Sequence, residues 1–405
     1  MENKRVKYVS VEYVSPGHPD KVCDVIAECI VDEFFDQDIN SRVAVDGACK
    51  GKVFLCGEIT SSADVDIEQV ARRAIDACGY FPRDNRPQEE SANFNWRDTP
   101  IELNFTQQSP DIAMGVDRYD NLLEKTAGDQ GMCISGAIKE SPNFVSHAQE
   151  IARIIGICLW EDVMEEVLEW ARQDIKTQVT IKYENEVPVE VTDVVVSISH
   201  EDEISLEDIR KFVKVYVQRI LDKYGEENNL KVDNVNFFVN ATGKFAVYGP
   251  QSDSGEVGRK IVCDQTGGIF AVGGGNLNGK DATKVDRTGA YGARYAAKNV
   301  VAANLATKCE VNVAYCIGVK DPVSVTVNCF GTNKIPEQQI EEAVKAVFDF
   351  TPGGMIKQFN MISDIETRGW KYEDLAKFGH IGNPCCDNLP WEQVDKVQEL
   401  LDYLK

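Results

Sequence analysis

A glycine-rich segment between residues 253 and 287 places the strongest constraint on this 405-residue chain. Eight of its 35 residues are glycine, so the backbone here must approach another group closely or take positive φ angles. The segment also gathers charged residues in a chain whose net charge is −23. They are the cations Arg259, Lys260, Lys280, Lys284 and Arg287 and the acids Asp253, Asp281 and Asp286. Glycine-rich backbone with cations suits a polyphosphate, and the carboxylates suit an accompanying metal ion.

Two other interpretations of this segment stay open at this point. Residues 283–286 fit a capping box before an alanine-rich helix, so Asp286 can be simply an acid in a first helical turn. Residues 274–280 match the first part of a phosphate-binding P-loop, with the apolar run 269–272 just upstream. However, Asp281 stands where that motif needs a serine or threonine hydroxyl, so a P-loop ATPase is the second choice.

The composition is that of a globular protein with two or three domains, 43% hydrophobic and 27% charged. The acidic balance argues against nucleic-acid binding, because no basic face is evident outside the glycine-rich segment. Thirteen cysteines without CxxC spacing predict reduced, mostly buried thiols, and disfavour zinc ribbons and a disulfide framework. The chain has no signal-peptide core and no run of about 18 apolar residues. We therefore expect a cytoplasmic protein with no membrane partner.

A second segment that carries chemistry follows an expected strand at residues 6–14. Pro19 fits the first position of a helix, which puts His18 at the N-cap and Asp20 in the first turn. A phosphate, a metal ion and an oxyanion donor could meet there, since the helix dipole already favours anions. An ordinary polar helix start explains the same residues. The functional interpretation is favoured because the chain has only four histidines.

The remaining pattern alternates one-sided strands with helices, which predicts an α+β fold. The first part has a hairpin turning near residues 50–51, a helix ending before Gly79, a strand from residue 101 and a loop over about 108–117 that suits a lid. The rest has helices at about 151–172, 206–224 (capped by Ser205) and 336–348, and strands at about 178–183, 189–199, 310–317 and 323–330. It also has two strands around Gly243 and a helical tail at 392–405.

Nine segments, in order from residue 12 to residue 382, resemble the S-adenosylmethionine synthetase (methionine adenosyltransferase) family. They are EYVSPGHPDK, GEITSSADVDIE, QSPDIAMGVD, AGDQG, NATGKFAVYGP, SDSGEVGRKIVCD, GGGNLNGKDATKVDR, ARYAAKNVVAA and FGHIG. The resemblance implies three similar α/β-sandwich domains about a pseudo-threefold axis. It places them at about 1–118, 119–248 and 249–405, with some interleaving. It also implies a homodimer or homotetramer with active sites at the dimer interface.

The same resemblance implies a reaction in two parts. Methionine sulfur displaces the triphosphate from the 5′ carbon of ATP, and the tripolyphosphate is then hydrolysed to phosphate and diphosphate. Sulfur needs no general base, so positioning and charge neutralisation carry the catalysis. The catalytic residues carried over are His18, Lys176, Arg259, Lys260 and Lys280.

Binding roles are carried over in the same way. ATP would contact His18, Asp174, Lys176, Lys244, Phe245, Asp253, Arg259, Lys260, Asn276 and Lys280. Methionine would contact Glu58, Gln108, Asp253 and Lys284. Two Mg²⁺ ions would be held by Asp20 and Asp286, and K⁺ by Asp46.

Several positions depart from the usual pattern of the family. Asp46 replaces a common glutamate, so dependence on K⁺ is an open question. Lys244 replaces an arginine, which removes the planar guanidinium fork but keeps the charge. In the segment GGGNLNGKD, Asn276, Leu277 and Asn278 stand in place of the alanine, phenylalanine and serine of the usual GGGAFSGKD. Near the end of the chain, GHIGN replaces the usual GHFGR. A catalytically silent regulatory subunit is the alternative outside enzymes, but such a subunit would be expected to have lost the charged residues that are present here.

Overall fold

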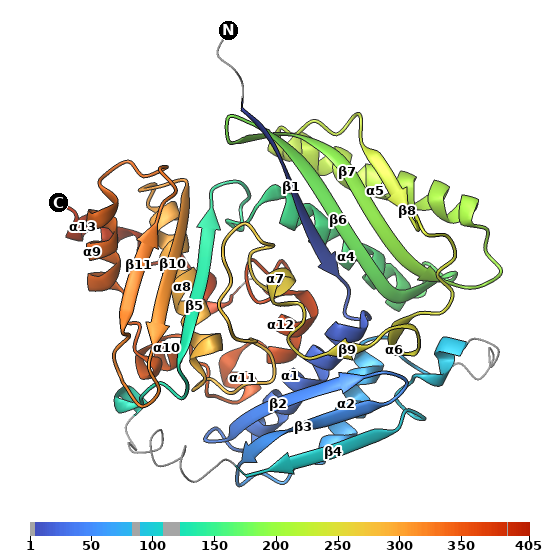
Figure 1. Ribbon diagram of the computed structural model, residues 1–405, viewed down its shortest axis with the longest axis horizontal. Helices are drawn as coiled ribbons and strands as arrows, with labels where there is room; N and C mark the ends of the chain where they lie inside the picture. Colours follow the sequence, from blue (N-terminus) through green and yellow to red (C-terminus); the bar gives the residue numbers. More distant parts are fainter. Residues whose placement is uncertain (1–4, 83–89, 108–121, 387) are drawn as a thin grey trace.

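The computed structural model describes residues 5–82, 90–107, 122–386 and 388–405. Three sheets surround a centre that holds helices α1, α7 and α12 (Figure 1). Their strand orders are β1-β6-β7-β8, β11-β10-β5 and β4-β3-β2-β9. This is the α+β fold of three sheet-and-helix domains that the sequence predicts.

Most neighbouring strands are antiparallel, and the pairs β3–β4 and β7–β8 are parallel. The strand bounds are β1 Val6–Val14, β2 Arg42–Cys49, β3 Val53–Thr60, β4 Ile101–Thr106, β5 Gly131–Ile138, β6 Ala171–Glu184, β7 Val187–His200, β8 Asn236–Val239, β9 Gly255–Glu256, β10 Lys308–Tyr315 and β11 Ser324–Asn328. Residues in β10 alternate between buried and half-buried, as expected for a strand with one covered face.

Helices cover one face of each sheet. The helix bounds are α1 Pro19–Gln37, α2 Ile67–Ala77, α4 His147–Met164, α5 Leu206–Asn228, α6 Gly249–Ser252, α7 Ile261–Asp264, α8 Val285–Ala302, α9 Glu337–Val347, α10 Pro352–Gln358, α11 Ile365–Arg368, α12 Tyr372–Phe378 and α13 Val397–Tyr403. Helix α4 packs on β1 and β6, α8 packs on β5 and β10, and α1 packs on β2 and α2. None of the described helices is both long and apolar enough to cross a membrane.

Each sheet combines segments that are far apart in the sequence. Strand β1 pairs with β6, so residues 6–14 lie beside residues 176–184. Strand β5 pairs with β10, and β9 pairs with the end of β2. Figure 1 shows dark-blue β1 lying in the green sheet and blue-green β5 lying beside the orange strands. The chain therefore closes each sheet with long-range contacts.

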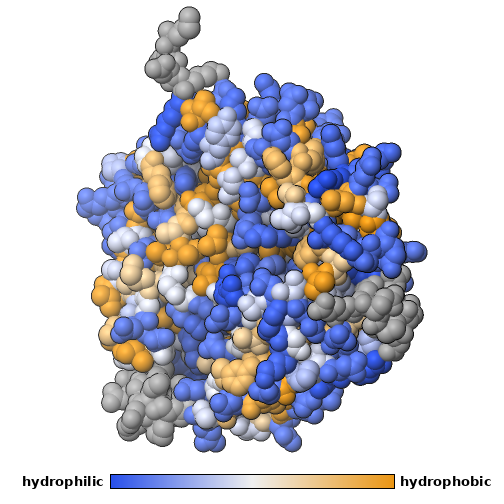
Figure 2. Space-filling view, turned by 45° about the vertical axis from the view of Figure 1, so that its right-hand side comes forward, coloured by the Kyte–Doolittle hydropathy of each residue, from blue (hydrophilic) through white to orange (hydrophobic). Residues whose placement is uncertain are grey.

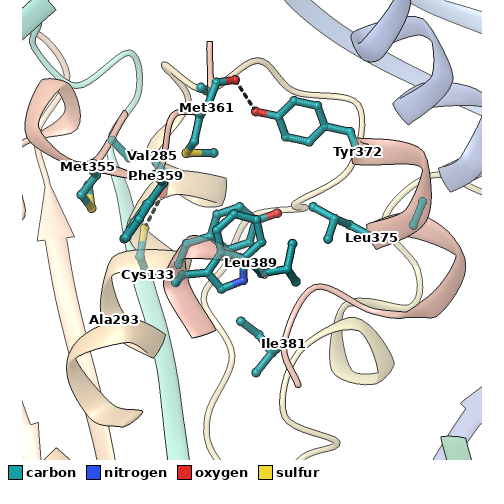
Figure 3. Packing of buried hydrophobic residues seen from close by; sticks show 14 of the residues in the cluster. Cys133, Val285, Ala293, Met355, Phe359, Met361, Tyr372, Leu375, Ile381 and Leu389 are labelled. Atoms are coloured by element: carbon teal, nitrogen blue, oxygen red, sulfur yellow. Dashed lines mark hydrogen bonds between the residues drawn. The ribbon is translucent and has the colours of Figure 1, made fainter. Parts of the chain in front are cut away.

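The start of α8 rests on an apolar core built from the C-terminal segments. Figure 3 shows Phe359, Leu375, Ile381 and Leu389 converging there. Tyr372 donates a hydrogen bond to the carbonyl of Met361 (3.0 Å) at the edge of this cluster. This packing fixes the N-terminal end of α8, which carries Asp286.

Helix α1 lies almost fully buried although it carries charged residues. Asp20, Asp24, Glu28 and Asp32 lie four residues apart, and each is at most 5% exposed. Glu28 forms an ion pair with Arg287, and neither side chain is exposed. Because an unpaired buried charge is costly, these acids must be met by partners from elsewhere in the chain.

Three local predictions are wrong. The capping box at 283–286 does not form: Lys284 is the N-cap of α8 without a side-chain cap, and the Thr283 hydroxyl donates to Asp281 (2.6 Å). The second strand expected after Gly243 does not form: the N–H groups of Phe245 and Tyr248 donate to the side chains of His200 and Ser91, and the Phe245 carbonyl accepts the His200 N–H (3.1 Å) at the end of β7.

The third wrong prediction concerns helix ends. The helix expected at 151–172 ends at Met164, since Glu166 takes a positive φ of 59° and the chain reverses into β6. The tail helix α13 is also shorter than predicted. The caps at His18 and Ser205, the turn at 50–51 and the positive φ of Gly79 are confirmed. All thirteen cysteines are free thiols, and most are buried or half-buried.

We predict that Glu28→Gln lowers the free energy of unfolding by about 3–5 kcal/mol, because it leaves the buried Arg287 guanidinium without a counter-charge. Glu33→Gln on the same helix is the matched control. Glu33 pairs with Arg73 at 2.5 Å at the surface, where Arg73 is 64% exposed, and its loss costs about 0–1 kcal/mol. Chemical denaturation measures both, and equal losses would contradict the role given to the buried pair.

Candidate active site

His18 forms the N-cap of α1 with extended backbone angles (φ −66°, ψ 140°). Its Nδ1 accepts a hydrogen bond from the backbone N–H of Asp20 (3.2 Å). Burial, and then the charge of Lys260, lowers the pKa of His18 to about 4. The ring is therefore neutral at pH 7, and because Nδ1 accepts, its proton lies on Nε2 and is available to a ligand.

Asp20 is 2% exposed and collects donors on both carboxylate oxygens. Lys260 Nζ lies 2.6 Å from Oδ2, the Glu256 N–H lies 3.0 Å from Oδ1, and Arg259 Nε lies 3.7 Å from Oδ1. Burial alone raises the pKa of Asp20, but the hydrogen bond and charge of Lys260 lower it overall. The carboxylate is thus held ionised.

Glycine permits this close approach. A Cβ on Gly255 would lie 2.1 Å from the carbonyl oxygen of Pro19, so a side chain at this position would push β9 away from the first turn of α1. Strand β9 carries Glu256 and leads directly into Arg259 and Lys260. The glycine-rich segment therefore does what its composition predicts at this point.

A cavity of about 260 Å³ opens beside His18 and is lined by Asp174, Lys176, Phe245 and Asp253 among others. Asp174 accepts the Gly249 N–H (2.8 Å), and burial raises its pKa to about 7. Lys176 is 44% exposed and pairs with Glu12 (2.7 Å). The structure thus brings together most of the residues that the sequence assigns to ATP, and we call this group the His18 cluster: His18, Asp20, Asp174, Lys176, Phe245, Asp253, Arg259 and Lys260.

Other predicted residues form a second group around Lys280. Lys280 Nζ lies 2.5 Å from Asp286 Oδ2, and Lys284 pairs with the buried Asp281. Ala44 of β2 bridges to Lys280 on one side and faces Glu58 of β3 on the other, so Glu58 and Lys280 share one face of the sheet. We call Glu58, Lys280, Lys284 and Asp286 the Lys280 cluster.

Within the described ranges, no ion pair or hydrogen bond joins a side chain of the His18 cluster directly to one of the Lys280 cluster. Each group is therefore held by its own set of contacts.

Three predicted residues among those described stand apart from both clusters. Lys244 is 57% exposed and pairs with Asp202 at the surface. Asp46 is exposed on β2. The Asn276 amide donates to the backbone carbonyl of Asn278 (2.8 Å). Gln108 and the expected lid at 108–117 lie outside the described residues.

The P-loop interpretation is contradicted. Residues 269–272 form no strand, and the helix after Lys280 begins only at Val285. A P-loop needs a strand before the glycines and a helix N-terminus at the lysine, so that successive backbone N–H groups face the phosphates.

In the described part of the chain, no three His, Cys, Asp or Glu side chains gather in a group that could hold a metal ion. Asp20 and Asp286 lie in different clusters, so each offers one carboxylate. This fits Mg²⁺, which commonly takes one or two carboxylates and completes its shell with waters and substrate phosphates.

Sequence reasoning missed the buried acids of α1 beyond Asp20. Asp24 accepts a hydrogen bond from the N–H of Gly258 (2.8 Å), the residue directly before Arg259. Asp32 forms an ion pair with Arg368. The signal was present, because acids recur every four residues and so line one face of a helix that also has many apolar residues.

These features define a three-domain α+β protein with two polar clusters that carry several cations. Three family models match the chain in order: the S-adenosylmethionine synthetase N-terminal domain at residues 6–110, central domain at 124–245 and C-terminal domain at 247–393. An S-adenosylmethionine synthase of Fusobacterium nucleatum is 42% identical over 400 residues, which cover 98% of each chain.

A second S-adenosylmethionine synthase, from Clostridium botulinum, is 39% identical over 402 residues, covering 97% of this chain and 98% of the relative. The chain therefore belongs to the S-adenosylmethionine synthetase family.

We predict that Gly275→Ala lowers the rate of S-adenosylmethionine formation about 100-fold, because a Cβ there would lie 1.9 Å from Asp286 Cγ and displace that carboxylate. Gly274→Ala is the matched control, since its Cβ meets nothing within 4 Å. Steady-state rates of both variants, with melting temperatures to verify folding, test this. Equal rates for the two variants would show that Asp286 does not act in the reaction.

Proposed function

We propose that the His18 cluster of one copy and the Lys280 cluster of a second copy together form the site where ATP and methionine react. As a member of its family, the chain is a methionine adenosyltransferase that makes S-adenosylmethionine from ATP and L-methionine. What supports the shared site is that, among the described residues, no direct ion pair or hydrogen bond joins the two clusters within one copy, although both offer cations suited to one polyphosphate.

In the first part of the reaction, the methionine sulfur attacks the 5′ carbon of ATP and the triphosphate leaves. His18 donates its Nε2–H to the oxygen that becomes the leaving group, which its neutral tautomer permits. Lys176, Arg259, Lys260 and Lys280 neutralise the triphosphate. No general base is needed, because a thioether sulfur carries no proton to remove.

In the second part, tripolyphosphate is hydrolysed to phosphate and diphosphate while the same cations still hold it. Asp20 and Asp286 would each hold one of two Mg²⁺ ions, which neutralise phosphate charge when bound. Asp20 suits this role because Lys260 and the Glu256 N–H keep it ionised and fixed. The ring of Phe245 and the buried Asp174 lie on the same cavity and suit the nucleoside of ATP.

The remaining assignments follow the family pattern. Lys244 and Asn276 join the ATP site, and Asp253 lies where it can serve both substrates, because it lines the His18 cavity and is exposed. Methionine contacts Glu58, Gln108 and Lys284. Asp46, exposed on β2, stands where the family's usual glutamate helps to bind K⁺. We place the domains at 1–118, 119–248 and 249–405, with β1 and β5 exchanged between them, and the protein in the cytoplasm.

Pairing of two copies is supported by the uncovered faces of the sheets. Exposed apolar side chains lie on strands that have helices on one face only, among them Tyr8 of β1 (61% exposed), Phe54 of β3 and Met132 of β5. Figure 2 shows apolar side chains gathered in patches between polar ones on one face of the molecule. Apolar surface of this kind marks interfaces, and we propose a homodimer or a homotetramer of two such dimers.

We predict that purified protein with ATP, Mg²⁺ and K⁺ forms S-adenosylmethionine with equal amounts of phosphate and diphosphate, and only when methionine is present. Mass spectrometry of the products measures this. His18→Asn should lower the rate about 100-fold or more, because a hydrogen bond made in the transition state is lost. A rate within about threefold of wild type would refute the role of His18, and ATP binding without turnover would point to a silent subunit.

A fourth prediction concerns K⁺. We expect turnover to change less than about twofold when K⁺ is replaced by tetramethylammonium, because the shorter Asp46 side chain reaches less far than the usual glutamate. Asp46→Glu is the comparison variant and should gain K⁺ dependence. A strong K⁺ requirement in the wild type would show instead that Asp46 still serves the ion.

A further inference from the structure

Asn278 lies in the loop between Gly275 and Lys280, in the three-residue stretch where this chain departs from its family's usual pattern. Its side chain is 1% exposed. The amide Nδ2 donates to Asp264 Oδ2 (3.0 Å), and Oδ1 lies 2.8 Å from His380 Nε2. One amide thus bridges a buried carboxylate and a buried imidazole from two distant segments.

The direction of each hydrogen bond along this path follows from the carboxylate, which only accepts. Asn278 Nδ2 must donate to Asp264, so Oδ1 accepts and His380 Nε2 donates. His380 Nδ1 then accepts from the Tyr291 hydroxyl (2.6 Å), whose oxygen accepts from Arg287 (3.3 Å). Asn278, His380 and the Tyr291 hydroxyl each have the partner that their chemistry requires, so these three groups specify a single arrangement.

The two ends of the path reach the two clusters. At one end, Lys21 donates hydrogen bonds to Asp264 (2.6 Å) and Asp24 (3.2 Å). Lys21 directly follows Asp20 in the first turn of α1. At the other end, Arg287 follows Asp286 in the first turn of α8. Asn278 therefore joins the His18 cluster and the Lys280 cluster through the interior of one copy.

The opposite side of the same loop is attached to β2. The Val45 N–H donates to the Gly279 carbonyl (2.7 Å), and the Asp281 N–H donates to the Val43 carbonyl (2.9 Å). Gly279 has a positive φ of 73°, and a Cβ on it would lie 2.2 Å from the Val45 carbonyl oxygen. The residues on either side of Lys280, Gly279 and Asp281, are thus hydrogen-bonded to the backbone of β2. Asn278, two residues before Lys280, bridges Asp264 and His380.

We propose that Asn278 is a positioning residue that holds the Lys280 loop in register with the first turn of α1, so that both clusters of one copy respond together to bound polyphosphate. This inference rests on the proposed function, since it takes Lys280 to bind the triphosphate. An asparagine suits the role because its amide carries a donor and an acceptor in one plane. A serine at this position offers one shorter hydroxyl, which leaves either Asp264 or His380 without its partner.

The test uses the full-length protein and inorganic tripolyphosphate with Mg²⁺, measured by isothermal titration calorimetry. Asn278→Ser should weaken binding about tenfold. The matched control is Asn299→Ser, since Asn299 is an equally buried amide that bonds to Tyr295, Gln393 and Lys396 away from both clusters, and its loss should leave the affinity unchanged.

A double-mutant cycle with Lys280→Met separates positioning from general weakening of the fold. If Asn278 acts through Lys280, adding Asn278→Ser to Lys280→Met should change the affinity less than twofold further. Full additivity, or wild-type affinity in a folded Asn278→Ser variant, would overturn the proposal while leaving the proposed function intact. A wild type that binds no tripolyphosphate would defeat the proposed function and this inference with it.

Hydrogen exchange of the wild type supplies a measurement that does not depend on the variant folding. The backbone N–H groups of His380 and Ile381 donate to the carbonyl of Asp264 (2.8 and 3.1 Å), so they report on this path without belonging to either cluster. Tripolyphosphate should slow exchange in peptides that cover residues 379–383. Unchanged exchange there, with binding confirmed by calorimetry, would also overturn the proposal.

Discussion

The structure depends on one constraint, the pairing of the charges that α1 carries into the protein interior. Asp20, Asp24, Glu28 and Asp32 recur every four residues on a helix that is buried along most of its length. An unpaired charge in that environment would cost several kcal/mol, so each acid recruits a donor from another part of the chain. The partners come from the glycine-rich segment, the start of α8 and the C-terminal region, at Lys260, Gly258, Arg287 and Arg368. Helix α1 thereby holds together segments that are more than 200 residues apart in the sequence.

The same constraint places the chemistry. The N-terminal end of α1 presents His18 to a cavity and Asp20 to Lys260, because Pro19 starts the helix there, and Gly255 lets β9 pass close enough to place Arg259 and Lys260 beside them. A buried carboxylate that already holds two donors is ionised and rigid, which suits preorganised binding of a charged group. The family relationship adds that the substrates are ATP and methionine. In the proposed function, the His18 cluster of one copy and the Lys280 cluster of a second copy together surround one polyphosphate.

Local sequence predicted well wherever local physics decides the outcome. The caps at His18 and Ser205 and the turn near Gly51 were confirmed, because each depends on residues within a few positions. The predictions that failed depend on long-range partners. The sequence allowed Thr283 to cap α8, but the Thr283 hydroxyl donates to Asp281 instead. The other carboxylate oxygen of Asp281 accepts the N–H of Val43 in a distant strand. The segment after Gly243 was expected to form a strand. However, the backbone N–H groups of Phe245 and Tyr248 donate to the side chains of His200 and Ser91.

By itself, the sequence determined the α+β class and the family, and it identified the charged residues that we propose serve the reaction, because motifs and helix caps depend on neighbouring residues. Only the tertiary structure decided how those residues divide between two clusters. It also decided that Lys244 turns to Asp202 and that Asn278 bridges Asp264 and His380. The physical reason is that burial and hydrogen-bond partnership are properties of contacts between distant segments. A carboxylate or an amide has the same sequence signature whether it faces water, a substrate or a buried partner.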